Sequence, residues 1–456
     1  MTQVLVPIAC LGVAALVSAC ASYHALPLPR RPDLAPDLAA LVRVLPPSEA
    51  GSQPQTIDPA KPLEIDQIGL LAILNDPDLR SERGEMDVAR AGLIQASLLP
   101  NPSSSLGYAA LLGGPGTTAA YMASLSQDVA SIVTYQPRNE AARAHVDQVN
   151  ADLLWREWQV AQKARLLAFD LYWTDRSVEL NRHELDLISE EAARVQAATS
   201  AGNLDITALA PLLAAKAAAE QALASLNLKR LKNWQALDAL LGLMPGARFA
   251  ISQPAEPPLP NDLETLIEGL PDHRPDLVAL QLGYHSADAN VRAAILGQFP
   301  AFVLGGTWNS DTTNVKSAGP NITFDLPIFN RNQGQIAQTR ATRLLLREQY
   351  QSRLDSAIAD IHGLVAQAAR LSEDLVQARQ AAASAESLAQ AARAAYRQGN
   401  LDQRSLTDYL TTALQRQLEI VSLERSLGED RITLAVELGL GLPQARLSPP
   451  DRMTSQ

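Results

Sequence analysis

Apolar residues recur every seven positions along two long stretches of the sequence. The members are Val146, Leu153, Val160 and Leu167 in the first stretch and Leu354, Ile361, Ala368 and Leu375 in the second. This spacing is typical of helices that pack along a coiled seam. The pattern predicts helices over residues 139–200 and 333–398, each roughly 90 Å long at about 1.5 Å per residue.

Shorter elements flank each long helix in the same order. The periodicity predicts a helix over residues 66–98 and again over 262–297, followed each time by two short strands. After each long helix it predicts a further helix, over residues 205–241 and 402–440.

Short motifs also recur in order, which indicates a duplicated unit. The pairs are DPDL (76–79) with RPDL (274–277), LLPNP (98–102) with QFPAF (298–302), LSQDV (125–129) with TFDLP (323–327), PRNEAARA (from 137) with NRNQGQIA (from 330), GNLD (202–205) with GNLD (399–402), and LLGLMPG (240–246) with LGLGLPQ (438–444). We therefore predict a first repeat over residues 66–250, a second over 251–443 and a tail over 444–456.

The strand segments have the length and partial alternation of membrane strands. They cover residues 102–112 and 118–129 in the first hairpin (102–129) and residues 299–309 and 318–328 in the second (299–328). Four strands cannot close a barrel, and an open edge in lipid leaves amides unpaired. Eight strands from two chains or twelve from three are possible, and only the larger barrel has an obvious aqueous lumen. A soluble pair of hairpins on a helical bundle is the alternative.

The two GNLD motifs have the residues of a tight turn between helices. Gly202 and Gly399 supply the left-handed residue that commonly ends a helix. Asp205 and Asp402 can cap the next helix. Two copies place two such turns at one end of the molecule.

Composition argues against several functions. A net charge of −11 disfavours nucleic acid, whose binding depends largely on Lys and Arg. The six histidines have no metal-ligand spacing, and neither HExxH nor a P-loop occurs. GGPGTT lacks the lysine of a phosphate cradle and is better interpreted as a hairpin loop. We expect no enzyme activity, no cofactor and no metal site.

The first twenty residues are typical of a lipoprotein leader. LVPIACLGVAALVSAC is about as long as a signal-peptide core and ends in Val17-Ser18-Ala19-Cys20, which resembles a bacterial lipobox. The sequence thus predicts a signal peptide over residues 1–19, acylation of Cys20 and a proline-rich tether over residues 20–65. The residue after Cys20 is Ala21 and not Asp, which for such lipoproteins implies passage to the outer membrane.

Three segments together resemble the TolC-like outer-membrane efflux channels. They are NDPDLRSERGEMDVARAGLIQASLLPNP, FDLPIFNRNQGQIAQTRATR and the paired turns AGNLDITAL and YRQGNLDQRSLTDYL. The second is most similar to the heavy-metal efflux branch. The resemblance implies a mixed α and β membrane protein: a homotrimer with a twelve-stranded barrel in the outer membrane and an α-helical coiled-coil barrel across the periplasm. It also implies two partners, a periplasmic adaptor and an inner-membrane pump of the resistance-nodulation-division type.

The resemblance also assigns roles by position. The turns formed by Gly202, Asn203 and Leu204 and by Gly399, Asn400 and Leu401 are where the adaptor docks. Tyr396 and Asp408 match residues that hold the tunnel mouth closed, and Arg404 is a possible charge partner. The function expected is a passive conduit for substrates that the pump delivers. A lipid-anchored coiled-coil scaffold without transport and a protein-secretion duct of the same fold remain alternatives.

Overall fold

The computed structural model describes residues 25–45, 55–255, 258–260, 262–300 and 302–440. By their contacts, the residues divide into two units, Met1–Leu34 and Ala35–Gln456. In the first unit, residues 25–34 form neither helix nor strand. The described helices and strands belong to the second unit.

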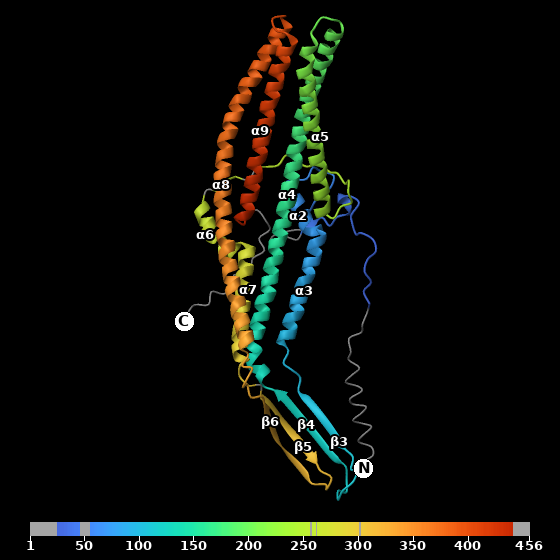
Figure 1. The fold of residues 1–456 in the computed structure, drawn as a ribbon, viewed down its shortest axis with the longest axis vertical. Coiled ribbons are helices and arrows are strands. Elements are labelled where there is room, and N and C mark those ends of the chain that lie inside the picture. The colour runs from blue at the N-terminus through green and yellow to red at the C-terminus, as the bar shows by residue number, and fades with distance from the viewer. Residues whose placement is uncertain (1–24, 46–54, 256–257, 261, 301, 441–456) are drawn as a thin grey trace. The chain divides into compact units, whose positions relative to one another are not determined.

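The two halves of this unit contain the same elements in the same order. The first half has α2 (Ile65–Asn75), α3 (Pro77–Ser97), β3 (Ser103–Ala109), β4 (Ala120–Asp128), α4 (Ala130–Ser200) and α5 (Leu209–Leu240). The second half has α6 (Leu263–His273), α7 (Pro275–Leu296), β5 (Phe302–Ser310), β6 (Lys316–Phe324), α8 (Gln333–Arg397) and α9 (Gln403–Glu437). The strands lie at one end of the helices and the α4–α5 and α8–α9 turns at the other (Figure 1).

Each helix predicted before a hairpin is in fact two helices. α2 ends at Asn75, and the Asp76 carboxylate then accepts hydrogen bonds from the amides of Asp78 and Leu79 at the start of α3. Pro77 is the first residue of α3, and Pro275 is likewise the first residue of α7. A proline fits the first turn of a helix but interrupts one that reaches it from the N-terminal side. The predicted helices 66–98 and 262–297 were therefore wrong at these points.

The two long helices differ in how deeply their heptad seams are buried. In α8, Ile361, Ala368 and Leu375 are buried, and α8 packs along α9. The four seam residues of α4 are only half-buried, because α4 also packs against α2, α3, α5, α7 and α9 and spreads its buried positions around the helix. α4 begins at Ala130, nine residues before the predicted start, and continues through Pro137.

Part of the predicted tether is packed on the helices. Leu38, Leu41, Ile57 and Leu63 are buried in one cluster with Phe169 of α4. The backbone is also held, because the Ala35 amide donates to Gly242 and the Leu63 amide donates to Ala250. The apolar residues between the prolines explain this packing: the described part of the predicted tether lies against the helices.

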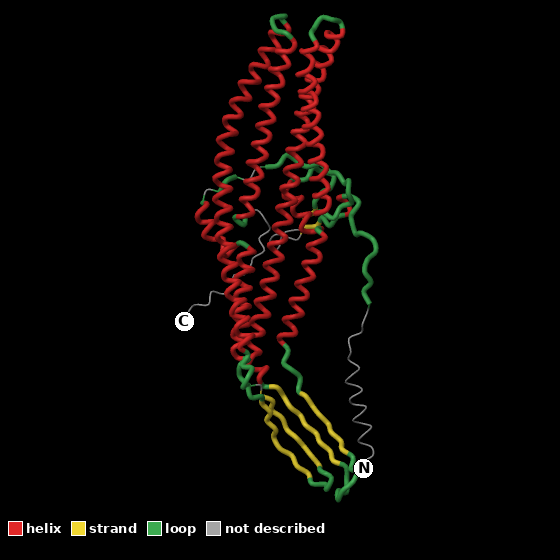
Figure 2. Tube along the Cα trace, in the orientation of Figure 1, coloured by secondary structure: helices red, strands yellow, loops and turns green. Residues whose placement is uncertain are grey.

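The main sheet is antiparallel, with strand order β3-β4-β5-β6 (Figure 2). A further two-residue pair, β1 (Val44–Leu45) with β2 (Gln55–Thr56), lies apart from it. Two predicted hairpins therefore join side by side through β4 and β5. β3 and β6 form the two edges of the sheet and pair on one side only.

A buried ion cluster ties α7 to α9 and α4. Arg274, just before α7, donates from Nε to Asp276 at 2.8 Å and also pairs with Glu437 at the end of α9. Its guanidinium lies 4.8 Å from the centre of the Trp155 ring on α4. Hydrogen bonds and charge from both carboxylates raise the pKa of Arg274 although its burial opposes this. These contacts fix the C-terminal end of α9 against the middle of the helical layer.

Candidate functional site

The four-stranded sheet has one polar face. Ser103 lies opposite Ser126 and Ser105 opposite Ser124, and the hydroxyl oxygens of each pair are 2.8 Å apart. Because side chains alternate between faces along a strand, these serines define one face. By strand register the same face carries Thr307, Asn309, Ser317, Asn321 and Thr323, with Met122 and Val303 as its larger apolar members.

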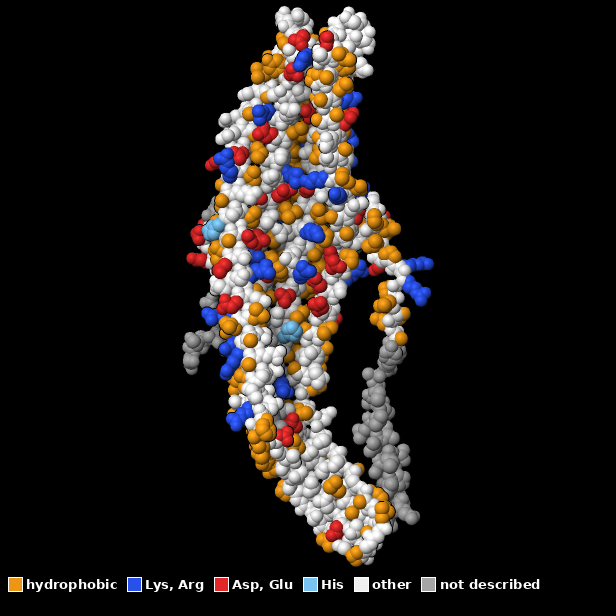
Figure 3. Space-filling model, in the orientation of Figure 1, with side chains coloured by type: hydrophobic (Ala, Val, Ile, Leu, Met, Phe, Trp, Pro, Cys, Tyr) orange, Lys and Arg blue, Asp and Glu red, His pale blue; other side chains and the backbone are white. Residues whose placement is uncertain are grey.

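The opposite face of the sheet is apolar and uncovered. It carries Leu106, Tyr108, Tyr121, Leu125, Phe302, Leu304, Trp308, Ile322 and Phe324. Each of these side chains is at least 42% exposed, and hydrophobic side chains are visible over the sheet in Figure 3. A contiguous exposed apolar surface of this kind marks contact with a membrane or a partner.

The described helices do not supply a membrane span of their own. None of them combines enough length with enough apolar character to cross a bilayer.

The two GNLD turns have the same backbone geometry. Gly202 has φ +74° and Gly399 has φ +75°, in the left-handed region that favours glycine. The Gly202 amide donates to Thr199 and the Asn203 amide donates to Ala198. At the second turn, Gly399 donates to Tyr396 and Asn400 donates to Ala395. Both turns are thus Schellman caps, which satisfy the last carbonyls of α4 and α8.

The two aspartates of the motif each cap the next helical element. Asp402 accepts from the Ser405 amide at 2.9 Å, at the start of α9. Asp205 accepts from the Thr207 amide at 2.8 Å, and there it caps a single 3-10 turn (Ile206–Ala208) that precedes α5. The amide hydrogen bonds lower the pKa of both carboxyls. Both caps are therefore ionised at neutral pH.

The remaining predicted residues are near the second turn but are not joined to one another. Tyr396 lies in the last turn of α8, and Arg404 and Asp408 lie at the start of α9 with exposed side chains. Within the described part of the chain, no hydrogen bond or ion pair links these three side chains. Leu204 is exposed and Leu401 half-buried. Cys20, the segment 1–19 and the tail 444–456 lie outside the described residues.

A polar seam between α4 and α9 was not predicted from the sequence. Asp170, Ser177, Glu184 and Glu191 follow one another at intervals of seven along α4. The Asp170 carboxylate pairs with Arg425 of α9 at 2.5 Å and with Lys229 of α5 at 3.0 Å. Nearer the turns, Glu184 accepts from Gln415 at 3.4 Å. The heptad spacing of these polar residues was the available signal.

Glu191 is the member of this seam that lies next to the second turn. It is 2% exposed, and burial raises the pKa of its carboxyl although Arg194 and a hydrogen bond from Gln403 oppose the change. The nearby Asp402 and Asp408 carboxylates raise it further. A buried carboxyl therefore faces the start of α9, where the predicted tip residues are.

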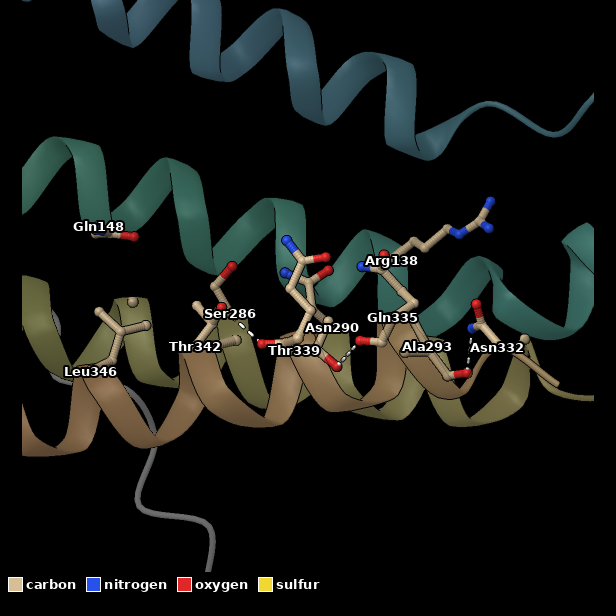
Figure 4. Close-up of a pocket in the computed structure, with 15 residues that line it drawn as sticks. Arg138, Gln148, Ser286, Asn290, Ala293, Asn332, Gln335, Thr339, Thr342 and Leu346 are labelled. Atoms are coloured by element: carbon tan, nitrogen blue, oxygen red, sulfur yellow. Dashed lines mark hydrogen bonds between the residues drawn. The ribbon is translucent and has the colours of Figure 1, made fainter. Parts of the chain in front are cut away.

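A groove of about 610 Å³ lies over α7, between α4 and α8, at the end of the helices nearest the sheet (Figure 4). Its floor is made of small residues such as Gly283, Ala287 and Ala294, and its walls carry amides and hydroxyls. Asn332 donates to the Ala294 carbonyl at 2.8 Å. Arg138 is the charged residue among those that line it. The groove offers hydrogen bonds but no acid–base pair.

Metal-binding chemistry has no support among the described side chains. In the described ranges, no group of three or more His, Cys, Asp or Glu side chains is placed to hold a metal ion.

Comparison with known proteins assigns the second half of the chain to a family. Residues 266–440 match the family model described as outer membrane efflux protein. A search of curated protein sequences gave no match.

Several solved outer-membrane channels have a similar structure. The Campylobacter jejuni CmeC outer membrane channel is 15% identical with a TM-score of 0.67, over 82% of this chain and 85% of that one. The outer membrane protein VceC of Vibrio cholerae is 18% identical with a TM-score of 0.67, over 83% and 96%. The open state of the Neisseria gonorrhoeae MtrE outer membrane channel is 18% identical with a TM-score of 0.68, over 83% and 89%. Residues 266–440 therefore match the outer membrane efflux protein family, and the chain as a whole has the fold of the TolC-like outer-membrane efflux channels.

Proposed function

We propose that this chain is the outer-membrane channel of a tripartite efflux system and that three copies close a twelve-stranded barrel. The two-faced sheet is the observation that carries the proposal. An apolar face suits lipid and a serine- and amide-rich face suits a water-filled lumen. Edges that pair on one side only suit a barrel shared between copies, because unpaired edge amides in lipid cost several kcal/mol each.

The helices continue this lumen as a periplasmic tunnel. The α4–α9 contact joins the two helix hairpins, and its polar seam supports a mouth that opens there. Hydrogen bonds and ion pairs in the seam can be exchanged for water, and opening would also have to separate the apolar cluster of Leu180, Leu414 and Val421 in the same contact. Tyr396, Arg404 and Asp408 regulate this mouth. The conduit is passive and carries out no catalysis, and the inner-membrane pump supplies the energy.

A periplasmic adaptor docks on the two turns formed by Gly202, Asn203 and Leu204 and by Gly399, Asn400 and Leu401. The two turns end in the same kind of helix cap and lie at the same end of the molecule, which is consistent with a partner that recognises the same surface twice. Ile206 and Leu204 add exposed apolar area there, at 71% and 45%. Such exposed apolar side chains beside polar turns are suited to packing against a partner helix.

Replacement of Gly399 by Val should impair adaptor docking and efflux while trimers persist. The side chain itself meets open space, but a φ of +75° strains any residue with a branched Cβ. The measurements are copurification of the adaptor and resistance of cells to the pump's substrates. The matched control is Gly246→Val, since Gly246 also has a positive φ and open space but lies away from the turns. Normal resistance in the Gly399 variant would count against the assigned docking surface.

Cys20 carries the lipid anchor in this proposal. Cys20→Ser should abolish incorporation of labelled palmitate, whereas Cys10→Ser should retain it, because Cys10 lies inside the predicted signal segment. Label that persists in the Cys20 variant would remove the lipoprotein assignment.

Conductance in a planar lipid bilayer tests the proposed function. The purified protein should insert as a stable pore, and a coiled-coil scaffold should give no conductance. Deletion of the gene should then raise sensitivity to metals or drugs. A block in export of a protein, with sensitivity unchanged, would instead support the secretion duct.

A further inference from the structure

The sheet edges raise a question that the proposed function leaves open: which residues of β6 meet which residues of β3 in the neighbouring copy. The duplication of the chain supplies an answer, because each half carries the same pair of strands. If neighbouring copies repeat the relation between the two halves, the β4–β5 ladder within one chain is the template for the ladder between copies. This inference rests on the proposed shared barrel.

Equivalent strands of the two halves differ by a constant number of residues, which can be read from the sequence and checked in the structure. Pro100 and Pro300, which precede the first strand of each pair, lie 200 positions apart, and Asp128 and Asp325, at the end of the second strand, lie 197 apart. When 200 is added to the residue number in β3 and 197 to the residue number in β4, the observed pair Ser103↔Ser126 becomes Val303↔Thr323. That pair is present in the β5–β6 ladder. The two hairpins therefore have equivalent registers.

The same shifts, applied to the β4–β5 ladder, specify the ladder between copies. The pair Ser126↔Gly305 becomes Thr323 opposite Ser105 of the neighbouring copy. Likewise Leu125↔Gly306 becomes Ile322 opposite Leu106. We propose that copies of this chain join edge to edge in this register, with Thr323 directly opposite Ser105.

The directions of the backbone groups agree with this register. The Val129 amide donates to the Phe302 carbonyl, which fixes the alternation of hydrogen-bonded pairs across the sheet. By that alternation the even-numbered residues of both β3 and β6 direct their N–H and C=O groups to the free edges. Ile322 and Leu106 are both even-numbered and form a hydrogen-bonded pair. If β6 moved by one residue along β3, the even-numbered residues of one strand would face odd-numbered residues of the other, and their backbone groups could not pair. The only alternative registers nearby are therefore shifted by two residues.

The side chains agree as well. Thr323 and Ser105 both lie on the polar face, and Ile322 and Leu106 both lie on the apolar face. Pro320 falls opposite Tyr108 and has no N–H to donate, so this seam has one ladder bond fewer than β4–β5. Proline in a sheet is normally confined to an edge strand, as β6 is within one chain. In the closed barrel Pro320 would leave the Tyr108 carbonyl of the neighbouring copy without a ladder partner.

Cysteine cross-linking distinguishes the registers. Thr323 and Ser105 would be a non-hydrogen-bonded pair, whose Cα atoms are about 4.5 Å apart, within the range of a disulfide. Mild oxidation of membranes that contain the Ser105→Cys/Thr323→Cys variant should give covalent trimers on a denaturing, non-reducing gel. Ser103→Cys/Thr323→Cys and Gly107→Cys/Thr323→Cys represent the two slips of two residues. In the proposed register each of these two pairs is diagonal across the seam, with Cα atoms about 7–8 Å apart. The yield of cross-linked trimer should therefore be about tenfold lower than for the Ser105/Thr323 pair.

Two controls complete the design. Ser124→Cys/Thr307→Cys joins β4 to β5 within one chain at a pair that the structure contains, and it shows that oxidation has worked. Single-cysteine variants and the unmodified chain account for Cys10 and Cys20. Within one chain, β3 and β6 are separated by two strands, so their cross-link reports a neighbouring copy.

Each outcome has one meaning. Trimers from the Ser105/Thr323 pair support the register. Trimers from either slipped pair, or none from any pair although the protein remains trimeric and conducts, would overturn the register and leave the channel intact. A protein that stays monomeric in membranes and does not conduct would overturn both the register and the proposed function.

Discussion

Ile322→Arg should prevent assembly in the outer membrane, whereas Asn321→Arg should allow it. The two residues are neighbours in β6 and are both exposed, but Ile322 lies on the apolar face and Asn321 on the polar face. An arginine facing lipid costs up to about 2–4 kcal/mol, with the largest cost at the bilayer centre. Since three copies would each carry the charge, few trimers should form. The measurement is the amount of heat-sensitive trimer in outer-membrane fractions.

The Asn321 variant serves as the matched control and also tests the lumen. It should assemble and should shift the ion selectivity of the pore towards anions, because three added positive charges would face the water. Equal assembly of both variants, or assembly of the Ile322 variant alone, would show that the two faces of the sheet are wrongly assigned.

Gly428→Ala should destabilise the helical layer. A Cβ at Gly428 of α9 would overlap the Phe169 ring of α4, far inside any contact distance. Phe169 is fully buried and cannot turn away without leaving the central apolar cluster. Overpacking of this kind costs about 1–3 kcal/mol. The temperature at which trimers dissociate on a detergent gel should fall accordingly.

Gly363→Ala is the control for this change. Gly363 lies within α8, where a Cβ would meet nothing within 4 Å. That variant should be neutral or gain up to about 1 kcal/mol, since alanine is the better helix former. Phe169→Leu combined with Gly428→Ala should recover part of the loss, because leucine is smaller. If the Gly428 and Gly363 variants melt alike, the close packing of α9 on Phe169 is wrong.

Local features of this fold were predictable because their causes are local. The glycine turns and the aspartate caps depend on residues within about six positions. Each GNLD motif contains both the glycine that forms the turn and the aspartate that caps the next helical element. The same kind of signal explains an error: the predicted helices ran through Pro77 and Pro275, although a proline marks a first turn more readily than an interior. The opposite error occurred at Pro137, which lies inside α4 although the helix was predicted to begin after it.

Features that depend on distant residues could not be predicted in the same way. Gly428 meets Phe169, and Arg274 meets Glu437 and Trp155, across large separations in sequence. Nothing local identifies these partners. The burial of Leu38 and Ile57 also depends on where the helices place their apolar surfaces. Glu191 is an intermediate case, since its heptad spacing was visible but its burial was not.

The most direct test of the shared barrel is the number of copies in the native particle, measured by mass in lipid or a mild detergent. The barrel requires three copies, because each chain contributes the four strands β3 to β6 and the proposed barrel has twelve. A particle of three copies is the predicted result. A single copy, stable and with its sheet edges unpaired, would contradict it.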